Sequence, residues 1–201
     1  MSFDFDAPED VGGSGKFLNE PGTYHLAVMK VHEGQMANGK PISGFCVSMS
    51  VLAGTVEGQQ EKELDLTFFN GKLNSKDKGE FARKKQAAFL IAAGLMTPAQ
   101  LGQRGLKIDL SQSEGRQVVA TLEYDEHEGS EKKFLQLAYA NIYHPDDPRA
   151  KSFPKNAEAL SLIPTNQRHS ADYFAPLLKK PASAAAAPVR PQLNSQQLAE
   201  L

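Results

Sequence analysis

The residue types best suited to binding a charged ligand are the lysines and arginines of the segment 71–107. This segment holds eight of them against Asp77 and Glu80, although the whole chain has a formal net charge of -2. The eight are Lys72, Lys76, Lys78, Arg83, Lys84, Lys85, Arg104 and Lys107. Clustered cations attract phosphate backbones, because each phosphate that they neutralise releases condensed counterions. The same composition is typical of a solvated helix face, and residues 83–85 would spread over too wide an arc to contact one nucleic-acid strand together.

Aromatic side chains near these cations would offer stacking surfaces for unpaired bases, at ~1–3 kcal/mol per base. Phe69 is the clearest candidate, because it shares the polar side of a predicted strand with Asp65 and Thr67. It serves either as a stacking platform or as packing beneath a helix. Phe134 and Tyr143 are further candidates on the last predicted strand, where the pattern leaves the orientation of each face open.

Two polar loops carry the remaining candidate contacts. The first, "EGQMANGKP" at 33–41, contains two glycines and Lys40, and it either folds over a nucleotide strand or only connects two β-strands. The second, at 126–132, leads to two lysines but also contains three glutamates, which would repel phosphate. The candidate nucleic-acid contacts are therefore Lys40, Phe69, Lys72, Arg83, Lys84, Lys85, Lys132, Lys133, Phe134 and Tyr143.

Residues for catalysis or metal binding are poorly arranged. The five histidines show no ligand spacing, and the single cysteine, Cys46, excludes an internal disulfide and a cysteine-built zinc site. The stretch "HPDD" at 144–147 is more typical of a surface turn than of a metal site, and no Gly-rich phosphate loop is present. The sequence therefore predicts a protein without enzymatic activity, cofactor or metal. A metal-dependent nuclease built on Asp125 and "EKK" at 131–133 is a distant alternative.

These candidates require a mainly β scaffold. Apolar and polar residues alternate with the period of a β-strand at 23–32, 42–52, 61–70, 116–125 and 133–143. In the last of these, the alternation sets Leu135, Leu137 and Tyr139 on one face. Apolar residues at helical spacing predict a helix over 78–95, between the third and fourth strands. This order predicts a five-stranded OB-fold-like barrel, although a small antiparallel sheet with one helix across it would share the order.

The ends of the chain differ in composition from its middle. Residues 1–16 are acidic and Gly-rich and are expected to form a flexible arm, and residues 176–201 are expected to form a disordered Pro/Ala-rich tail. Between them we expect the nucleic-acid-binding domain at 17–145 and an irregular docked segment at 146–175. The N-terminus lacks the basic-then-apolar order of a signal peptide, and no apolar run is long enough to span a bilayer. A cytoplasmic protein with no membrane association is expected.

Several short motifs between Phe17 and Tyr143 follow one another in a characteristic order. They are "PGTYHLAV", "NGKPISGF", "LTFFN", "FLIAAGL", "LKIDLSQSEGRQVVATLEYD" and "NIY". In this order the motifs resemble a family of phage-encoded single-stranded-DNA-binding proteins that was long filed as a domain of unknown function. The resemblance implies an OB-like fold and a role in phage DNA replication or recombination inside the host cell.

The tail departs from what many single-stranded-DNA-binding proteins show. Those proteins often end in an acidic tail that recruits replication partners, whereas this tail sets Lys179, Lys180 and Arg190 against Glu200. The expected function is non-sequence-specific binding of single-stranded DNA. A second reading is a protein-interaction module that docks on replication or recombination proteins through the barrel and the tail. The sequence leaves open whether the chain forms a homo-oligomer.

Overall fold

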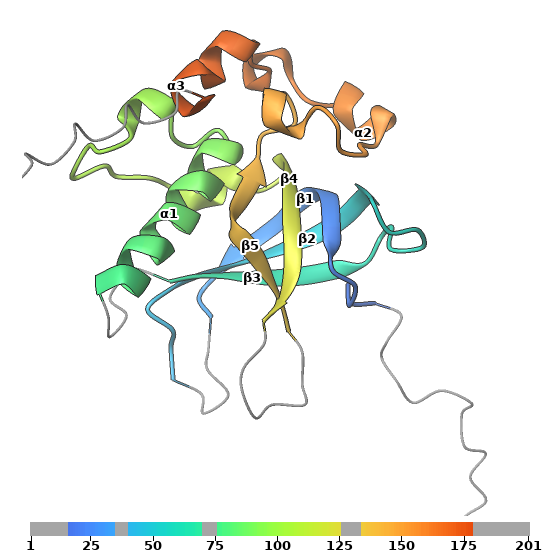
Figure 1. The fold of residues 1–201 in the computed structure, drawn as a ribbon, viewed down its shortest axis with the longest axis horizontal. Coiled ribbons are helices and arrows are strands. Elements are labelled where there is room, and N and C mark those ends of the chain that lie inside the picture. The colour runs from blue at the N-terminus through green and yellow to red at the C-terminus, as the bar shows by residue number, and fades with distance from the viewer. Residues whose placement is uncertain (1–15, 35–39, 70–75, 126–133, 179–201) are drawn as a thin grey trace, which may run out of the picture.

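The computed structural model describes residues 16–34, 40–69, 76–125 and 134–178 (Figure 1). Five antiparallel strands form one sheet in the order β3-β2-β1-β4-β5. The strands and the long helix are β1 (Gly22–His32), β2 (Gly44–Gly54), β3 (Glu63–Phe69), α1 (Lys76–Ala92), β4 (Gln117–Asp125) and β5 (Phe134–Tyr143). The mainly β architecture with one helix between the third and fourth strands is therefore confirmed.

The sheet does not close into a barrel, so the closed form of the prediction is wrong. β3 and β5 approach each other, yet they remain the two edges of the sheet. Two local features mark these edges. Residues 16–18 occupy the start of the free edge of β3, where Leu18 N–H donates to Glu63 O and Glu63 N–H donates to Lys16 O, both at 2.8 Å. The second feature is a distortion of β5.

β5 carries an irregularity in its pairing with β4. Leu137 and Ile142 lie opposite Leu122 and Ala120, so the β5 residues between them face a single β4 residue. Within this stretch Tyr139 has φ 52°, which is unusual for a residue other than glycine. A bulge of this kind bends its strand and increases the local twist. The irregularity therefore lies on one of the two edge strands that do not pair with each other.

The inner face of the sheet packs against α1 around a cluster of aromatic rings. Phe68 of β3 lies 4.9 Å from Phe89 of α1 and 5.2 Å from Phe45 of β2, measured between ring centroids. Gly94 ends the helix with φ 69°, which lets its own N–H donate to Ile91 O and Leu95 N–H donate to Leu90 O. These two bonds satisfy carbonyls that the end of a helix would otherwise leave unpaired.

Residues 144–178 cover part of the outer face of the sheet. Asn156 N–H donates to Nδ1 of the fully buried His25 on β1 at 3.1 Å, and the Gln117 amide on β4 donates to Ala159 O at 2.7 Å. Short helices in this segment are α2 (Ala157–Ser161) and α3 (Ala175–Leu178). Single turns of 3-10 helix occur at η2 (Pro98–Gln100), η3 (Leu110–Ser113), η4 (Pro148–Ala150), η5 (Thr165–Gln167) and η6 (Ala171–Phe174). None of the helices in the described ranges has the length and apolar character that crossing a bilayer requires.

Candidate nucleic-acid interface

A groove of about 850 Å³ lies between the two free edges of the sheet. β3 forms one wall through residues 65–69, and β5 forms the other through residues 134–137. Phe81, Ala82 and Lys85 line it from α1, which runs beside β5 in Figure 1. The lining is mostly apolar, so the failure of the sheet to close creates a hydrophobic cleft that is bounded by two strand edges.

Two exposed phenylalanines come from the opposite walls of this groove. Phe69 of β3 is 38% exposed and Phe134 of β5 is 59% exposed, whereas Phe68 is buried at 2%. Side chains alternate across a strand, so packing Phe68 into the core turns Phe69 outward. The predicted exposure of Phe69 is therefore confirmed. Flat apolar side chains on both walls are suited to contact the faces of planar ligands.

Lys85 is the one residue of the basic triplet at 83–85 that lines the groove. Its Nζ donates to Leu137 O on β5 at 2.7 Å and lies 4.8 Å from the centroid of the Phe81 ring. Burial lowers the pKa of Lys85, while the nearby carboxylates of Glu123 and Asp125 act in the opposite direction. This lysine is thus engaged in contacts within the protein.

Arg83 and Lys84 point elsewhere, because successive residues rotate by about 100° around a helix. Lys84 is exposed and forms an ion pair with Glu80 at 2.9 Å, and its hydrogen bond with Glu80 raises its pKa. Arg83 is exposed and lies on the side of α1 opposite Lys85. The expectation that the triplet would spread over a wide arc therefore agrees with the structure.

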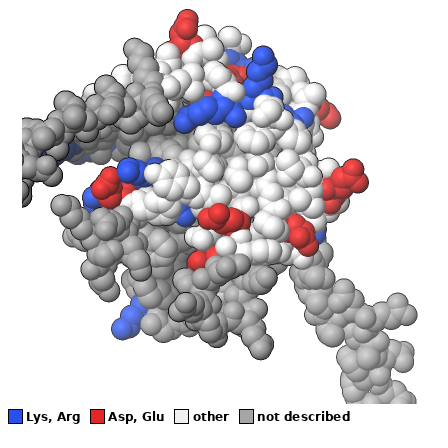
Figure 2. Space-filling view, in the orientation of Figure 1, with Lys and Arg blue, Asp and Glu red and all other residues white. Residues whose placement is uncertain are grey.

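The charge around the groove is mixed. Asp65 and Asp125 line it together with Lys85, so carboxylates outnumber cations on its described walls. In the view of Figure 2, lysine and arginine atoms gather mainly at the top, over residues 144–178, and acidic atoms are scattered over the strands. A phosphate would be repelled by the two aspartates. The groove is better suited to the neutral, planar part of a ligand.

Lys40 and Tyr143, two further predicted contacts, do not line the groove. Lys40 is exposed at the end of the β1–β2 loop. Tyr143 borders a separate hollow of about 270 Å³, where its hydroxyl donates to Asn141 Oδ1 at 2.9 Å and Arg149 lies 4.8 Å over its ring. Burial raises the pKa of Tyr143. Lys72, Lys132 and Lys133 lie outside the described residues.

Phe81 and Tyr139 were not selected from the sequence as site residues. Their ring centroids lie 5.0 Å apart, and Phe81 also contacts Lys85. Phe81 and Lys85 are about one helical turn apart, and this spacing could have predicted from the sequence that they share one face of the helix. Tyr139 was expected to share a face with Leu137, but Tyr139 is 55% exposed while Leu137 is buried at 3%, because the bulge interrupts the alternation.

The stretch "HPDD" forms a turn whose side chains are partly buried. His144 is 5% exposed and Asp147 is 2% exposed, so the expected surface position is wrong for these two residues. The His144 ring packs against His169 and Phe174, and burial lowers its pKa to about 4. Within the described ranges, no three or more His, Cys, Asp or Glu side chains gather where they could hold a metal ion.

Comparison with known proteins does not assign the chain to a family. Neither the family models nor the curated proteins that were searched match its sequence.

Proposed function

We propose that this protein binds single-stranded DNA without reading its sequence, in phage DNA replication or recombination. The observation that carries the proposal is the groove between β3 and β5, with Phe69 and Phe134 exposed on its opposite walls. Binding that tolerates any sequence requires aromatic surfaces, because every base presents a π-face for stacking. In a duplex the bases are already stacked and paired, so the groove would select unpaired strands.

The size of the groove supports this reading. Ligand clefts in proteins commonly measure about 300–1,000 Å³, and a groove of about 850 Å³ falls within that range. It has room for more than one base, and its apolar walls are suited to base faces. Asp65 and Asp125 would keep the phosphates outside. Exposed cations beyond the groove, such as Lys40 and Arg83, would then contact the phosphate backbone.

We further propose that the fold is an OB-like barrel opened between β3 and β5. In the observed order, a single additional pairing between these two edges would close all five strands into a ring. OB folds are partly open five-stranded barrels that bind oligonucleotides on their sheet and in the adjoining loops. The position of α1 between the third and fourth strands supports the same assignment.

The free edges of the sheet favour one alternative function, an interaction module for replication or recombination proteins. Glu63 directs its N–H and C=O away from β2, toward residues 16–18. Alternate residues of a strand face the same side, so Asp65 and Thr67 direct their backbone groups toward the groove. An extended peptide from a partner protein would pair with these groups.

Fluorescence anisotropy with a labelled oligothymidine at two salt concentrations tests the proposal. We expect saturable binding to the single strand, at least tenfold weaker binding to a duplex of equal length, and an intact oligonucleotide after incubation with Mg²⁺. Because Lys85 is the one cation on the described walls of the groove, the slope of log K against log salt should be shallow, about -2 for three phosphate contacts. No binding to the single strand would contradict the proposal and favour the interaction module.

A further inference from the structure

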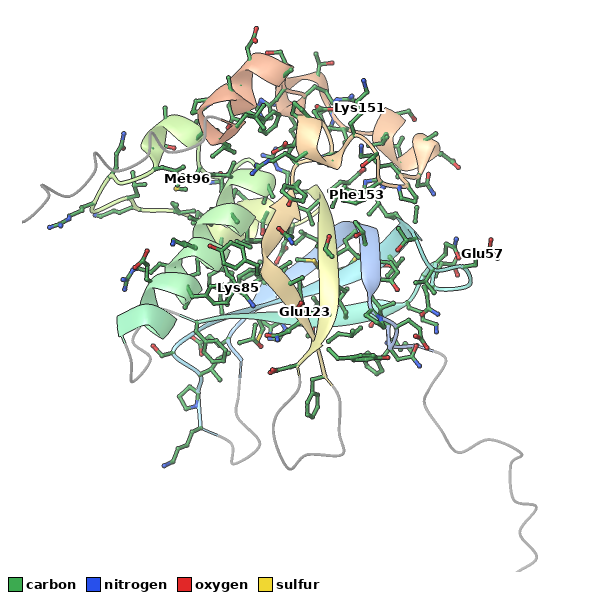
Figure 3. The ribbon with its side chains drawn as sticks, in the orientation of Figure 1. Glu57, Lys85, Met96, Glu123, Lys151 and Phe153 are labelled. Atoms are coloured by element: carbon green, nitrogen blue, oxygen red, sulfur yellow. The ribbon has the colours of Figure 1, made fainter. Side chains whose placement is uncertain are left out.

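Lys85 occupies the groove in a way that a phosphate contact does not explain. It is half-buried, and in Figure 3 it extends from α1 toward β5. Its ammonium donates to the backbone of Leu137 and lies over the Phe81 ring. A lysine that recruits phosphate is expected to keep its head group in solvent, so these contacts indicate a different role.

The carbonyl that Lys85 binds belongs to the free edge of the sheet. Leu137 lies opposite Leu122 in the pairing of the edge strand β5 with β4, and its oxygen accepts from Lys85 of α1. Leu137 is buried at 3%. A buried carbonyl without a partner costs about 1–3 kcal/mol, so nearly all such groups are paired. Lys85 thus supplies the hydrogen bond that a neighbouring strand would supply in a closed barrel.

The opposite wall presents backbone groups of the same kind. By the alternation that begins at Glu63, the N–H and C=O groups of Asp65 and Thr67 face the groove. The two edges therefore have the complementary groups that a strand pair requires. The Lys85 ammonium is already bonded to one of these edges, so it competes directly with pairing between β3 and β5.

We propose that Lys85 is a positioning residue that ties the free edge of β5 to α1, holds β5 apart from β3 and so keeps the groove open for bases. This inference rests on the proposed function, since it assigns Lys85 to the shape of the DNA-binding groove and excludes it from the phosphate contacts. Glu123 and Asp125 favour the charged form of the ammonium and disfavour a phosphate in its place.

Two substitutions separate the positioning role from phosphate contact. Lys85→Met removes the donor and keeps an unbranched side chain of similar length, and Lys85→Arg keeps both donor and charge. Lys151→Met is the matched control, because Lys151 is exposed on the C-terminal segment, away from the groove (Figure 3). Oligothymidine affinity is measured for each variant across a salt series.

We expect Lys85→Met to bind about tenfold more weakly, as loss of a hydrogen bond to a charged group predicts, with an unchanged salt slope. Lys85→Arg should recover most of the affinity, and Lys151→Met should match the unaltered protein. A salt slope that becomes shallower by about 0.7 in Lys85→Met would instead identify Lys85 as a phosphate contact and overturn the inference. Unchanged affinity would overturn it as well.

Amide hydrogen exchange without DNA tests the same role independently of the proposed function. Lys85→Met should change exchange at residues 65–69 and 134–137 while exchange in β1 stays the same. Identical exchange at these edges would refute the positioning role. If Lys85→Met does not fold, Lys85→Leu, which also lacks a donor, replaces it in both experiments. If the unaltered protein binds no single strand, the proposed function fails, and the exchange result still decides how Lys85 acts.

Discussion

The outer face of the sheet and the gap between its two edges differ in how their basic side chains are buried and bonded. On the outer face, residues 144–178 cover β1 and β4 and bury His25 completely. Between β3 and β5 the sheet stays open, and Lys85 rather than a strand satisfies the edge carbonyl of Leu137. Burial of His25 lowers its pKa to about 4, so this histidine is neutral at pH 7. Lys85 is desolvated too, but carboxylates favour its charged form.

This difference separates a sealed structural region from an open one suited to ligands. The sealed region buries neutral histidines that accept hydrogen bonds from backbone N–H groups of residues 144–178. The open region combines apolar walls, exposed phenylalanines and backbone groups at strand edges. Desolvated polar groups at a cleft are typical of functional sites. This contrast supports the proposal that bases bind in the groove.

Two adjacent phenylalanines on β3 give the largest expected contrast. Phe68→Ala should lower the free energy of unfolding by about 3–5 kcal/mol, because it leaves a cavity beside Phe89 and Phe45. Phe69→Ala should lower it far less, since Phe69 is 38% exposed. Urea denaturation of both variants measures the contrast. Equal destabilisation would show that Phe69 belongs to the core and would remove it from the groove.

Acid should weaken the sealed region first. Burial lowers the pKa of His25 from its ordinary value of 6.5 to about 4, so the unfolded chain binds the proton more readily. Above pH 6.5, neutral His25 contributes on the order of 3 kcal/mol to the free energy of unfolding. This contribution falls as the pH decreases and is lost near pH 4. His144 acts in the same direction, with its pKa also lowered to about 4.

Chemical denaturation between pH 4 and 7 measures this loss. His25→Gln should reduce the pH dependence by about one proton, because glutamine does not titrate in this range. Lowered pKa values of carboxyl groups such as Asp146 affect stability only at lower pH. A stability profile that is flat from pH 7 to 4 would contradict the assignment of His25 and His144 as buried neutral groups.

The double substitution Phe69→Ala with Phe134→Ala tests the open region. At ~1–3 kcal/mol for each stacked base, it should weaken oligothymidine binding by tenfold or more. Its salt slope should stay the same, because neither side chain carries charge. Anisotropy titration gives both quantities, and circular dichroism confirms that the fold is retained. Binding equal to that of the unaltered protein would exclude the groove as the base-binding surface.

The smallest effect is expected from Lys84. It is exposed and pairs with Glu80 one helical turn away. Exposed pairs of this kind contribute little to stability. Lys84→Met should leave the melting temperature unchanged and remove at most one phosphate contact, a change of about 0.7 in salt slope. If Lys84→Met lowered the affinity without changing the salt slope, it would behave as Lys85→Met is expected to behave. The two lysines would then not differ in role.

Local sequence patterns were sufficient to predict the strands and the helix. Period-two alternation placed all five strands, and Gly94 marked the end of α1. The exposure of Phe69 also followed from alternation along β3. The open sheet could not be predicted this way, because closure depends on edges from distant parts of the chain. The bulge at Tyr139 disrupted the expected face of β5 for a related reason, since its backbone conformation has no local signal.

Residue types alone predicted only part of the candidate site. The count of cations in the sequence put Arg83, Lys84 and Lys85 into one basic cluster. Their positions around the helix place them in different surroundings. The partner of Lys85 is a backbone carbonyl, which composition cannot reveal. The sequence indicated only a polar strand face for Asp65 and a distant nuclease alternative for Asp125, and the fold brings both residues to the groove. Among the residues that the structure describes, the predicted contacts that meet there are Phe69, Lys85 and Phe134.

Photo-crosslinking identifies the residues that contact the bases. An oligonucleotide that carries 5-iododeoxyuridine is bound to the full chain, irradiated, and the modified peptides are identified by mass spectrometry. Contact between bases and the groove predicts crosslinks at Phe69 and Phe134, with loss of each when that residue is replaced by alanine. Crosslinks confined to residues 144–178, on the sealed side of the sheet, would contradict this account.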